Sequence, residues 1–238
     1  MKTVIANWKM NKTVQEGLDY ISTFVELNPP IEQVKTIIAP SFVLMYPIFK
    51  SIGDLPIYLS GQNIFYENEG PYTGEVSGKA LKSSGCKYVI IGHSERRKLF
   101  FETDEIIYKK YIAAKNAGLI PIICFGEELT ERKEGKTLSV IENQLKNYFS
   151  VENIILAYEP VWSIGTGIVP KNSEIEEVTK FLKNKFSFNI TVLYGGSVTL
   201  SNIYSLLEVK NIDGFLVGGA SLNPLTFAKI IEASKIDE

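Results

Sequence analysis

The feature that most limits the fold of this chain is its alternation of short apolar segments with longer amphipathic segments, which continues from one end to the other. Eight apolar segments have the length of strands: residues 4–8, 36–39, 57–59, 88–91, 119–125, 154–158, 190–194 and 214–217. Most of them are continuously apolar, as strands are when both of their faces are covered. Strands that alternate with helices in this way predict a parallel sheet.

Helix signals occupy the segments between the predicted strands. Thr13 followed three residues later by Glu16 predicts a capped helix start, and Ser173 with Glu176 predicts a second one. Gly118 is expected to end the helix that precedes it. Two sets of apolar residues at helical spacing predict buried helix faces: Ile175, Val178 and Leu182, and Leu138, Ile141, Leu145 and Tyr148.

Eight strand–helix units in 238 residues fit a closed (β/α)8 barrel, a fold that often spans this length as one unit. We therefore expect one α/β catalytic domain over residues 1–238. The alternative is an open, doubly wound sheet. The glycine motif G-x-G-x-x-G that marks the first turn of such dinucleotide-binding sheets does not follow the first predicted strand.

Composition and charge exclude several classes of function. The chain has 25 Lys and Arg against 27 Asp and Glu, a balance that offers no basic surface for nucleic acid or an anionic membrane. No apolar stretch approaches the length of a membrane span, and the first residues turn polar too soon for a signal peptide, so we expect a cytoplasmic protein. One histidine and two separate cysteines predict neither a zinc site nor a disulfide framework, although a carboxylate site for magnesium stays open.

Polar residues and glycines gather at the carboxyl ends of the predicted strands, the end that carries the active site in this fold. In chain order they are Asn7, Lys9, Gln62, Asn63, His93, Glu95, Glu127, Glu159, Gly195, Gly196, Ser197, Gly218 and Gly219. Glycine backbone N–H groups can approach an anion closely, and phosphate sites in this fold often lie on the last two loops. A lysine, a histidine and a glutamate near two glycine pairs therefore indicate a catalytic site, while tight turns are the alternative for the glycines.

Two of these residues suit proton transfer. Glu159 ends a buried apolar run, which partly desolvates its carboxylate and favours a general base; a structural ion pair at the rim is the alternative. His93 precedes a short helical segment, residues 94–97, whose N-terminus disfavours positive charge and predicts a neutral imidazole. A neutral imidazole can donate a hydrogen bond to a carbonyl oxygen, whereas the alternative is a buried structural histidine.

Lys9 lies two residues after Asn7 in the first predicted strand, and the strand period of two predicts that both side chains share a face. A buried lysine needs an anionic partner, for which Glu95 and a bound phosphate are the candidates; a surface lysine is the alternative. The segment 160–167 has an aromatic residue near one end and glycines at the other, which suits a lid that closes on substrate. An ordinary surface loop has the same composition.

Six motifs resemble those of the triosephosphate isomerase family, in the family's order and over nearly the whole chain: residues 7–11, 92–97, 157–162, 164–167, 194–198 and 218–222. The resemblance implies a TIM barrel and an aldose–ketose isomerase of glycolysis and gluconeogenesis. Its reaction is the interconversion of dihydroxyacetone phosphate and D-glyceraldehyde 3-phosphate through an enediolate, with no metal or organic cofactor. Ser163 and Ile168 depart from the alanine and lysine that are common in the family at these positions.

The resemblance also implies a role for each residue that matches a family motif. Glu159 removes the substrate proton, and His93 polarises the carbonyl and moves protons between the two oxygens. Lys9 supplies positive charge, Asn7 helps to hold the oxyanion, and Glu95 orients Lys9 and His93. The substrate and phosphate ligands are Asn7, Lys9, Gly165, Ser197, Gly218 and Gly219, and the lid includes Pro160, Val161, Trp162, Gly165, Thr166 and Gly167.

The connection 64–77 after the third predicted strand is long and aromatic. A connection of this length without secondary structure is usually functional or disordered, and the aromatic content argues against disorder. Exposed aromatic residues on such a loop favour a partner surface. The resemblance implies a homodimer in which Thr73 reaches the neighbouring subunit near Asn7 and Glu95, against a pocket that includes Met10.

Two other functions fit part of the pattern. Another phosphate-binding barrel enzyme, such as a different sugar-phosphate isomerase or an aldolase, shares the glycine loops, but a Schiff-base aldolase needs a lysine inside the barrel near the substrate carbonyl. A catalytically silent binding or scaffolding protein is the second alternative. The presence of Lys9, His93 and Glu159 together argues against it.

Overall fold

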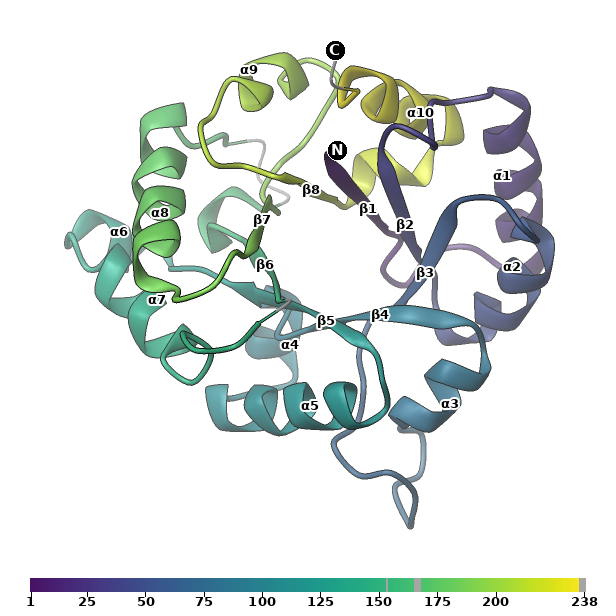
Figure 1. Cartoon of the computed structure of the whole chain (residues 1–238), viewed down its shortest axis with the longest axis horizontal. Coiled ribbons are helices and arrows are strands. Elements are labelled where there is room, and N and C mark those ends of the chain that lie inside the picture. The colour runs from purple at the N-terminus through teal and green to yellow at the C-terminus, as the bar shows by residue number, and fades with distance from the viewer. Residues whose placement is uncertain (153, 165–167, 236–238) are drawn as a thin grey trace.

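In the computed structural model, which describes residues 1–152, 154–164 and 168–235, eight parallel strands close into a barrel in chain order (Figure 1). The strands are β1 (Thr3–Asn7), β2 (Lys35–Ala39), β3 (Ile57–Gly61), β4 (Cys86–Ile91), β5 (Ile120–Phe125), β6 (Ile155–Tyr158), β7 (Thr191–Tyr194) and β8 (Gly214–Val217). Closure is made by β1 pairing with β8, with Thr3 beside Gly214. The predicted barrel is confirmed, and the open sheet is excluded.

Helices surround the barrel and connect its strands (Figure 1). The α-helices are α1 (Val14–Glu26), α2 (Met45–Ile52), α3 (Gly78–Ser83), α4 (Ser94–Leu99), α5 (Asp104–Asn116), α6 (Leu129–Lys133), α7 (Thr137–Leu145), α8 (Asn172–Lys185), α9 (Ile203–Leu207) and α10 (Pro224–Ala233). Short 3-10 helices in the described part of the chain are η1 (Phe42–Leu44), η2 (Val161–Ser163) and η3 (Gly219–Leu222). None of the helices in the described ranges is long and apolar enough to cross a membrane.

The strands read as continuous apolar runs because each one contributes to two cores. In β4, Tyr88 and Ile90 point into the barrel, where they pack with residues such as Ile5. Val89 and Ile91 point outward and pack against the helices. Both faces are therefore removed from water, as the sequence pattern predicted.

Helix starts agree with the sequence in one case and differ in the other. Thr13 caps α1, and the Glu16 carboxylate accepts the Thr13 backbone N–H at 2.7 Å, so this capping box is confirmed. The Ser173–Glu176 box is wrong. Helix α8 begins at Asn172, and it is Glu174 that accepts the N–H of Lys171 at 2.8 Å. Ser173 therefore lies within the first turn.

Candidate active site

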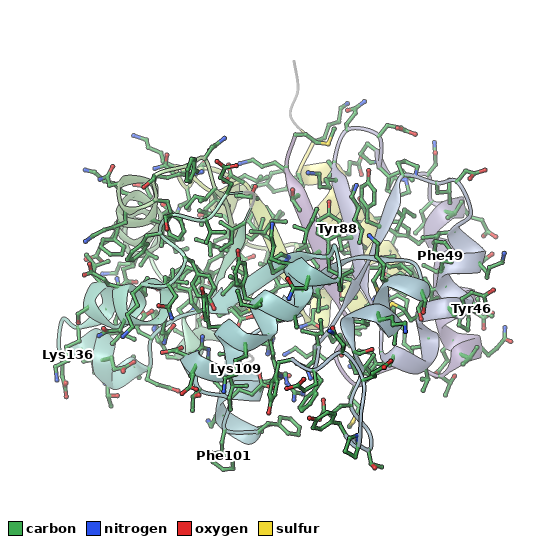
Figure 2. All side chains as sticks on the ribbon, turned by 60° about the horizontal axis from the view of Figure 1, so that its bottom comes forward. Tyr46, Phe49, Tyr88, Phe101, Lys109 and Lys136 are labelled. Atoms are coloured by element: carbon green, nitrogen blue, oxygen red, sulfur yellow. The ribbon has the colours of Figure 1, made fainter. Side chains whose placement is uncertain are left out.

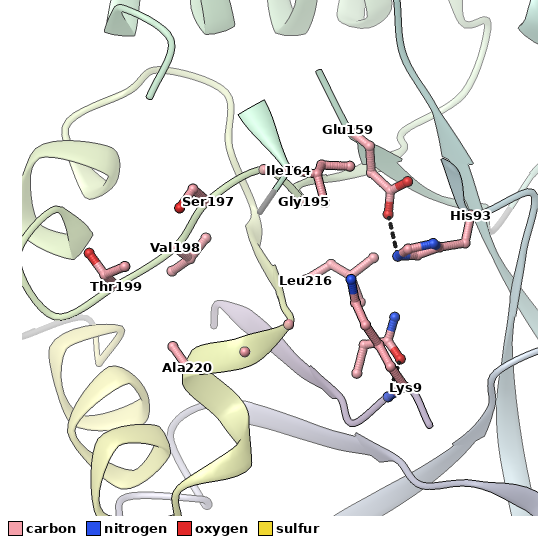
Figure 3. A pocket seen from close by; sticks show the side chains of 14 residues that line it. Lys9, His93, Glu159, Ile164, Gly195, Ser197, Val198, Thr199, Leu216 and Ala220 are labelled. Carbon is pink, nitrogen blue, oxygen red and sulfur yellow. Dashed lines mark hydrogen bonds and ion pairs between the residues drawn. The ribbon is translucent and has the colours of Figure 1, made fainter. Parts of the chain in front are cut away.

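A cavity of about 250 Å³ opens at the carboxyl ends of the strands (Figure 3). The predicted site residues that line it are Asn7, Lys9, His93, Glu159, Ser197, Gly218 and Gly219. They come from the ends of five different strands, and Figure 3 shows His93 and Glu159 at one side with Ser197 and Thr199 at the other. The barrel topology thus brings together residues that are far apart in the sequence.

Glu159 follows β6 directly and is 1% exposed. Its backbone N–H donates to Phe125 O at 2.8 Å, which extends the pairing of β6 with β5 by one residue. One carboxylate oxygen, Oε2, accepts the Ser94 N–H from the start of α4 at 2.9 Å. The other, Oε1, has no hydrogen-bond partner among the described residues and lies 3.4 Å from His93 Nε2. One oxygen is held in place, and the other is available to accept a proton.

His93 is the residue before α4, and its side chain caps that helix. Nδ1 accepts the Glu95 backbone N–H at 3.2 Å, so this nitrogen carries a lone pair and the ring proton belongs on Nε2. The short helix predicted after His93 is confirmed, since α4 begins at Ser94. A neutral ring with Nε2–H toward the cavity can donate a hydrogen bond to a substrate oxygen.

We expect the ring proton of His93 to lie on Nε2 and not on Nδ1. The cause is the Glu95 N–H, which donates to the Nδ1 lone pair. Nitrogen-15 NMR of the ring is the measurement, and assignment is direct because the chain has one histidine. A ring that carries its proton on Nδ1 would contradict this assignment.

Lys9 lines the cavity because of its backbone conformation and not because of the strand period that predicted a shared face. Strand β1 ends at Asn7, and Lys9 has a left-handed backbone with φ of 53°, so the shared-face argument is wrong although both residues line the cavity. Such a conformation costs about 1–3 kcal/mol for a residue with a side chain. Two hydrogen bonds hold it: Lys9 N–H donates to Asn7 Oδ1 at 3.1 Å, and Gln62 Nε2 donates to Lys9 O at 2.8 Å.

The ammonium group of Lys9 forms an ion pair with Glu95, whose other carboxylate oxygen lies 3.8 Å from His93 Nδ1. The Glu95 side chain is 44% exposed, so this pair borders solvent at the rim. The Lys9 side chain also passes Gly218, where an added Cβ would lie 3.4 Å from Lys9 Cε. Glu95 therefore contacts both residues that it was expected to orient.

The base of the predicted lid is described as far as Ile164. Pro160 is buried, and the short helix η2 follows it. Trp162 Nε1 donates to Glu127 at 3.1 Å. Burial raises the pKa of the Glu127 carboxyl, and the hydrogen bond from Trp162 opposes this shift. Gly165, Thr166 and Gly167 lie outside the described residues, so their assignment to the lid and the phosphate stays a prediction.

The structure adds residues to which sequence reasoning gave no role. Ser94 holds Glu159 through a backbone N–H that any residue type could supply, so no sequence signal marks it. Gln62 holds the backbone of Lys9 through a side-chain hydrogen bond, and its position as a polar residue at a strand end is the sequence signal that marks it. Cys124 interacts with Glu159, and burial together with the Glu159 charge raises the pKa of its thiol well above the usual value.

The two residues expected at a subunit contact, Thr73 and Met10, do not line this cavity. Thr73 is exposed on the connection between β3 and α3. Met10 lines a second, more open cavity with Asn11, Glu95 and Phe100. Within the described residues, no group of three or more His, Cys, Asp or Glu side chains is arranged to hold a metal ion.

Together, the fold and this cavity define a (β/α)8 barrel enzyme with a proton-transfer site for a small anionic substrate. The family model for triosephosphate isomerase matches residues 2–234. The chain belongs to the triosephosphate isomerase family, and it is therefore an aldose–ketose isomerase.

Relatives and a solved structure are similar to this chain over nearly its whole length. The triosephosphate isomerase of Dictyoglomus thermophilum is 45% identical over 246 residues, which cover 98% of this chain and 99% of that protein. That of Thermodesulfovibrio yellowstonii is 44% identical over 242 residues, which cover 97% and 98%. The crystal structure of triosephosphate isomerase from Bartonella henselae is similar with a TM-score of 0.87, at 36% identity and 99% coverage of both chains.

Proposed function

We propose that Glu159 and His93 perform the interconversion of dihydroxyacetone phosphate and D-glyceraldehyde 3-phosphate. Glu159 Oε1 takes a proton from the carbon beside the substrate carbonyl, and the carbonyl oxygen receives the Nε2 proton of His93, which gives the enediol. Glu159 then returns the proton to the former carbonyl carbon, while the hydroxyl group on the other carbon gives its proton back to His93 Nε2, which forms the new carbonyl and restores both side chains. The observation that carries the proposal is the unpaired Glu159 Oε1, 3.4 Å from His93 Nε2 in a buried cavity.

Lys9, Asn7 and Glu95 complete the electrostatic part of the proposal. The negative charge of the enediolate develops on the substrate oxygens, and Lys9 is a cation in the lining of the cavity that can stabilise it. Asn7 fixes the backbone of Lys9 and lines the same wall. Glu95 holds the ammonium group of Lys9 at the rim.

The phosphate group belongs at the opposite side of the cavity, where Ser197, Gly218 and Gly219 line the wall. In this fold the loops after the seventh and eighth strands are frequent phosphate sites. The lid is part of the same proposal: residues 160–162 form its described base, and Gly165 is the predicted phosphate donor within it. Triose phosphates carry a double negative charge and do not cross a bilayer, which supports the cytoplasm as the location.

A coupled isomerase assay tests the reaction. We expect the enzyme to convert each triose phosphate into the other. We expect no loss of activity after EDTA treatment, because no step of the proposal uses a metal. D-Ribose 5-phosphate serves as the matched control, since it carries a phosphate on a longer carbon chain. Failure to turn over either triose phosphate, with the protein folded, would overturn the proposal.

We also propose a homodimer, on the strength of an exposed apolar surface around the second cavity. Met10 is 96% exposed there, and the successive residues Leu99, Phe100 and Phe101 are all exposed, with Phe101 at 80%. Contiguous exposed apolar surface usually marks an interaction site. Phe101 also has a left-handed backbone, with φ of 55°, and points outward in Figure 2.

The connection 64–77 supplies the other half of the proposed contact. Phe65 packs against Tyr66 and Tyr72, with ring centroids 4.3 and 4.6 Å apart. These ring contacts stabilise the loop internally. Phe65 and Tyr66 are partly buried, so they are less available to a partner than the exposed residues of the loop. The exposed Thr73 near the end of this loop is the residue positioned to enter a partner's cavity.

A further inference from the structure

The side chain of Gln144, in α7, forms a double hydrogen bond with the backbone of Gly126. Its Oε1 accepts the Gly126 N–H at 2.9 Å, and its Nε2 donates to Gly126 O at 3.0 Å. We infer that Gln144 is a positioning residue for the catalytic carboxylate of Glu159, which it reaches through Gly126. The inference rests on the proposed role of Glu159 as the base.

Gly126 needs such a partner because its strand neighbour ends early. Phe125 O and Glu127 O accept the N–H groups of Glu159 and Val161, at 2.8 and 3.1 Å, so these two residues face β6. Backbone groups alternate in direction along a strand, and those of Gly126 therefore face away from β6. On that side β4 has already ended at Ile91. Buried N–H and C=O groups without a strand partner require another one, and the amide of Gln144 satisfies both.

Gly126 lies directly against the peptide group of Glu159. A Cβ added to Gly126 would be 1.8 Å from Glu159 O and 2.6 Å from Glu159 C, so no side chain fits between them. On the other side, a Cβ added to Gly195 would be 2.9 Å from Glu159 Cγ. Glu159 is thus held between two glycines, and Gln144 fixes the position of one of them.

A displacement of Gly126 would be transmitted to the catalytic oxygen because the contact is with the backbone of Glu159. Its carboxylate must keep the 2.9 Å contact with Ser94 N and the 3.4 Å separation from His93 Nε2. A shift of about 1 Å at a reacting group can cost roughly 10²-fold in rate. Gln144 itself does not line the cavity, so it can affect catalysis only through this chain of contacts.

The first test replaces Gln144 with leucine, which is close in size and lacks both hydrogen bonds. We expect kcat to fall about 10-fold, because a partial displacement costs less than a full 1 Å, with KM unchanged within about twofold. Asn172→Leu is the matched control. Asn172 is also a half-buried amide on an outer helix, but its bonds, at 3.0 and 3.2 Å, are to Ser205 O and Oγ in α9 and not to the backbone beside Glu159. The control should lose stability and keep kcat.

A second variant keeps the inference testable if Gln144→Leu folds poorly. Gln144→Glu keeps an acceptor for the Gly126 N–H and loses the donor to Gly126 O, and we expect a smaller decrease in kcat. Circular dichroism establishes that each variant is folded at the assay temperature. A normal kcat in folded Gln144→Leu and Gln144→Glu, or an equal loss in Asn172→Leu, would overturn the inference.

A double-mutant cycle with Glu159→Asp separates positioning from general stability. In the Glu159→Asp background the carboxylate is already displaced, so Gln144→Leu should lower kcat by less than about twofold there. The full 10-fold loss in both backgrounds would show that Gln144 acts elsewhere. If Glu159→Asp alone leaves kcat normal, the proposed function of Glu159 has failed, which is a result distinct from failure of the Gln144 inference.

Discussion

Glu159→Gln should lower kcat by about 10³-fold or more, because an amide cannot take up the proton that the carboxylate removes. The substitution preserves the size of the side chain, and an amide oxygen can still accept the Ser94 N–H that holds Oε2 at 2.9 Å. Binding of substrate should therefore change much less than turnover. Glu159→Asp retains a carboxylate but withdraws it by about 1 Å, for which we expect a loss of roughly 10²-fold.

Steady-state kinetics in both reaction directions measure these effects. Glu176→Gln is a suitable control, because it makes the same chemical change at a partly buried glutamate of α8, where Oε1 accepts the Lys210 N–H at 3.1 Å. The control should keep normal kcat. Near-normal turnover by Glu159→Gln would show that another residue is the base.

The barrel could be predicted from the sequence because burial on both faces produces continuous apolar runs. Each of the eight predicted strands matches a strand of the structure, with ends displaced by up to two residues. The ends are less predictable since they depend on contacts between distant segments. The first apolar run predicts that Trp8 belongs to the first strand, but β1 ends at Asn7, and the left-handed Lys9 that follows is held by Gln62, the residue after β3.

Part of the candidate site follows from the topology of the barrel, and part depends on tertiary contacts. Lys9, His93 and Glu159 could be brought together from the sequence because all carboxyl ends of a parallel barrel meet at one rim. Two contributions to the position of Glu159 could not be predicted. The Ser94 donor is a backbone group, and Gln144 comes from a helix whose partner, Gly126, is recognisable only when β4 and β5 are seen to end at different heights.

Thr73→Arg should convert the proposed dimer into monomers and lower turnover together. Thr73 is exposed on the connection 64–77, and its expected place in the partner lies beside Lys9 and Glu95. An arginine there would put a second positive charge next to the Lys9–Glu95 ion pair. Lys9 has a strained backbone and borders an open cavity in the single chain, so the partner loop would help to keep it in place. A displacement of Lys9 by about 1 Å corresponds to a loss of roughly 10²-fold in kcat.

Sedimentation at the concentration of the kinetic assay measures the oligomeric state, so that the loss of the dimer and the loss of turnover can be tested separately. Thr130→Arg is the matched control, since it adds the same charge at an exposed position on α6, a helix distant from the connection between β3 and α3 in Figure 1. It should remain a fully active dimer. A dimeric Thr73→Arg with normal turnover would exclude the loop from the interface, whereas a fully active monomer of the unmodified chain would exclude the dimer as the working form. The two effects are linked because the residue that Thr73 is expected to approach, Glu95, is 44% exposed in the single chain and forms an ion pair with Lys9.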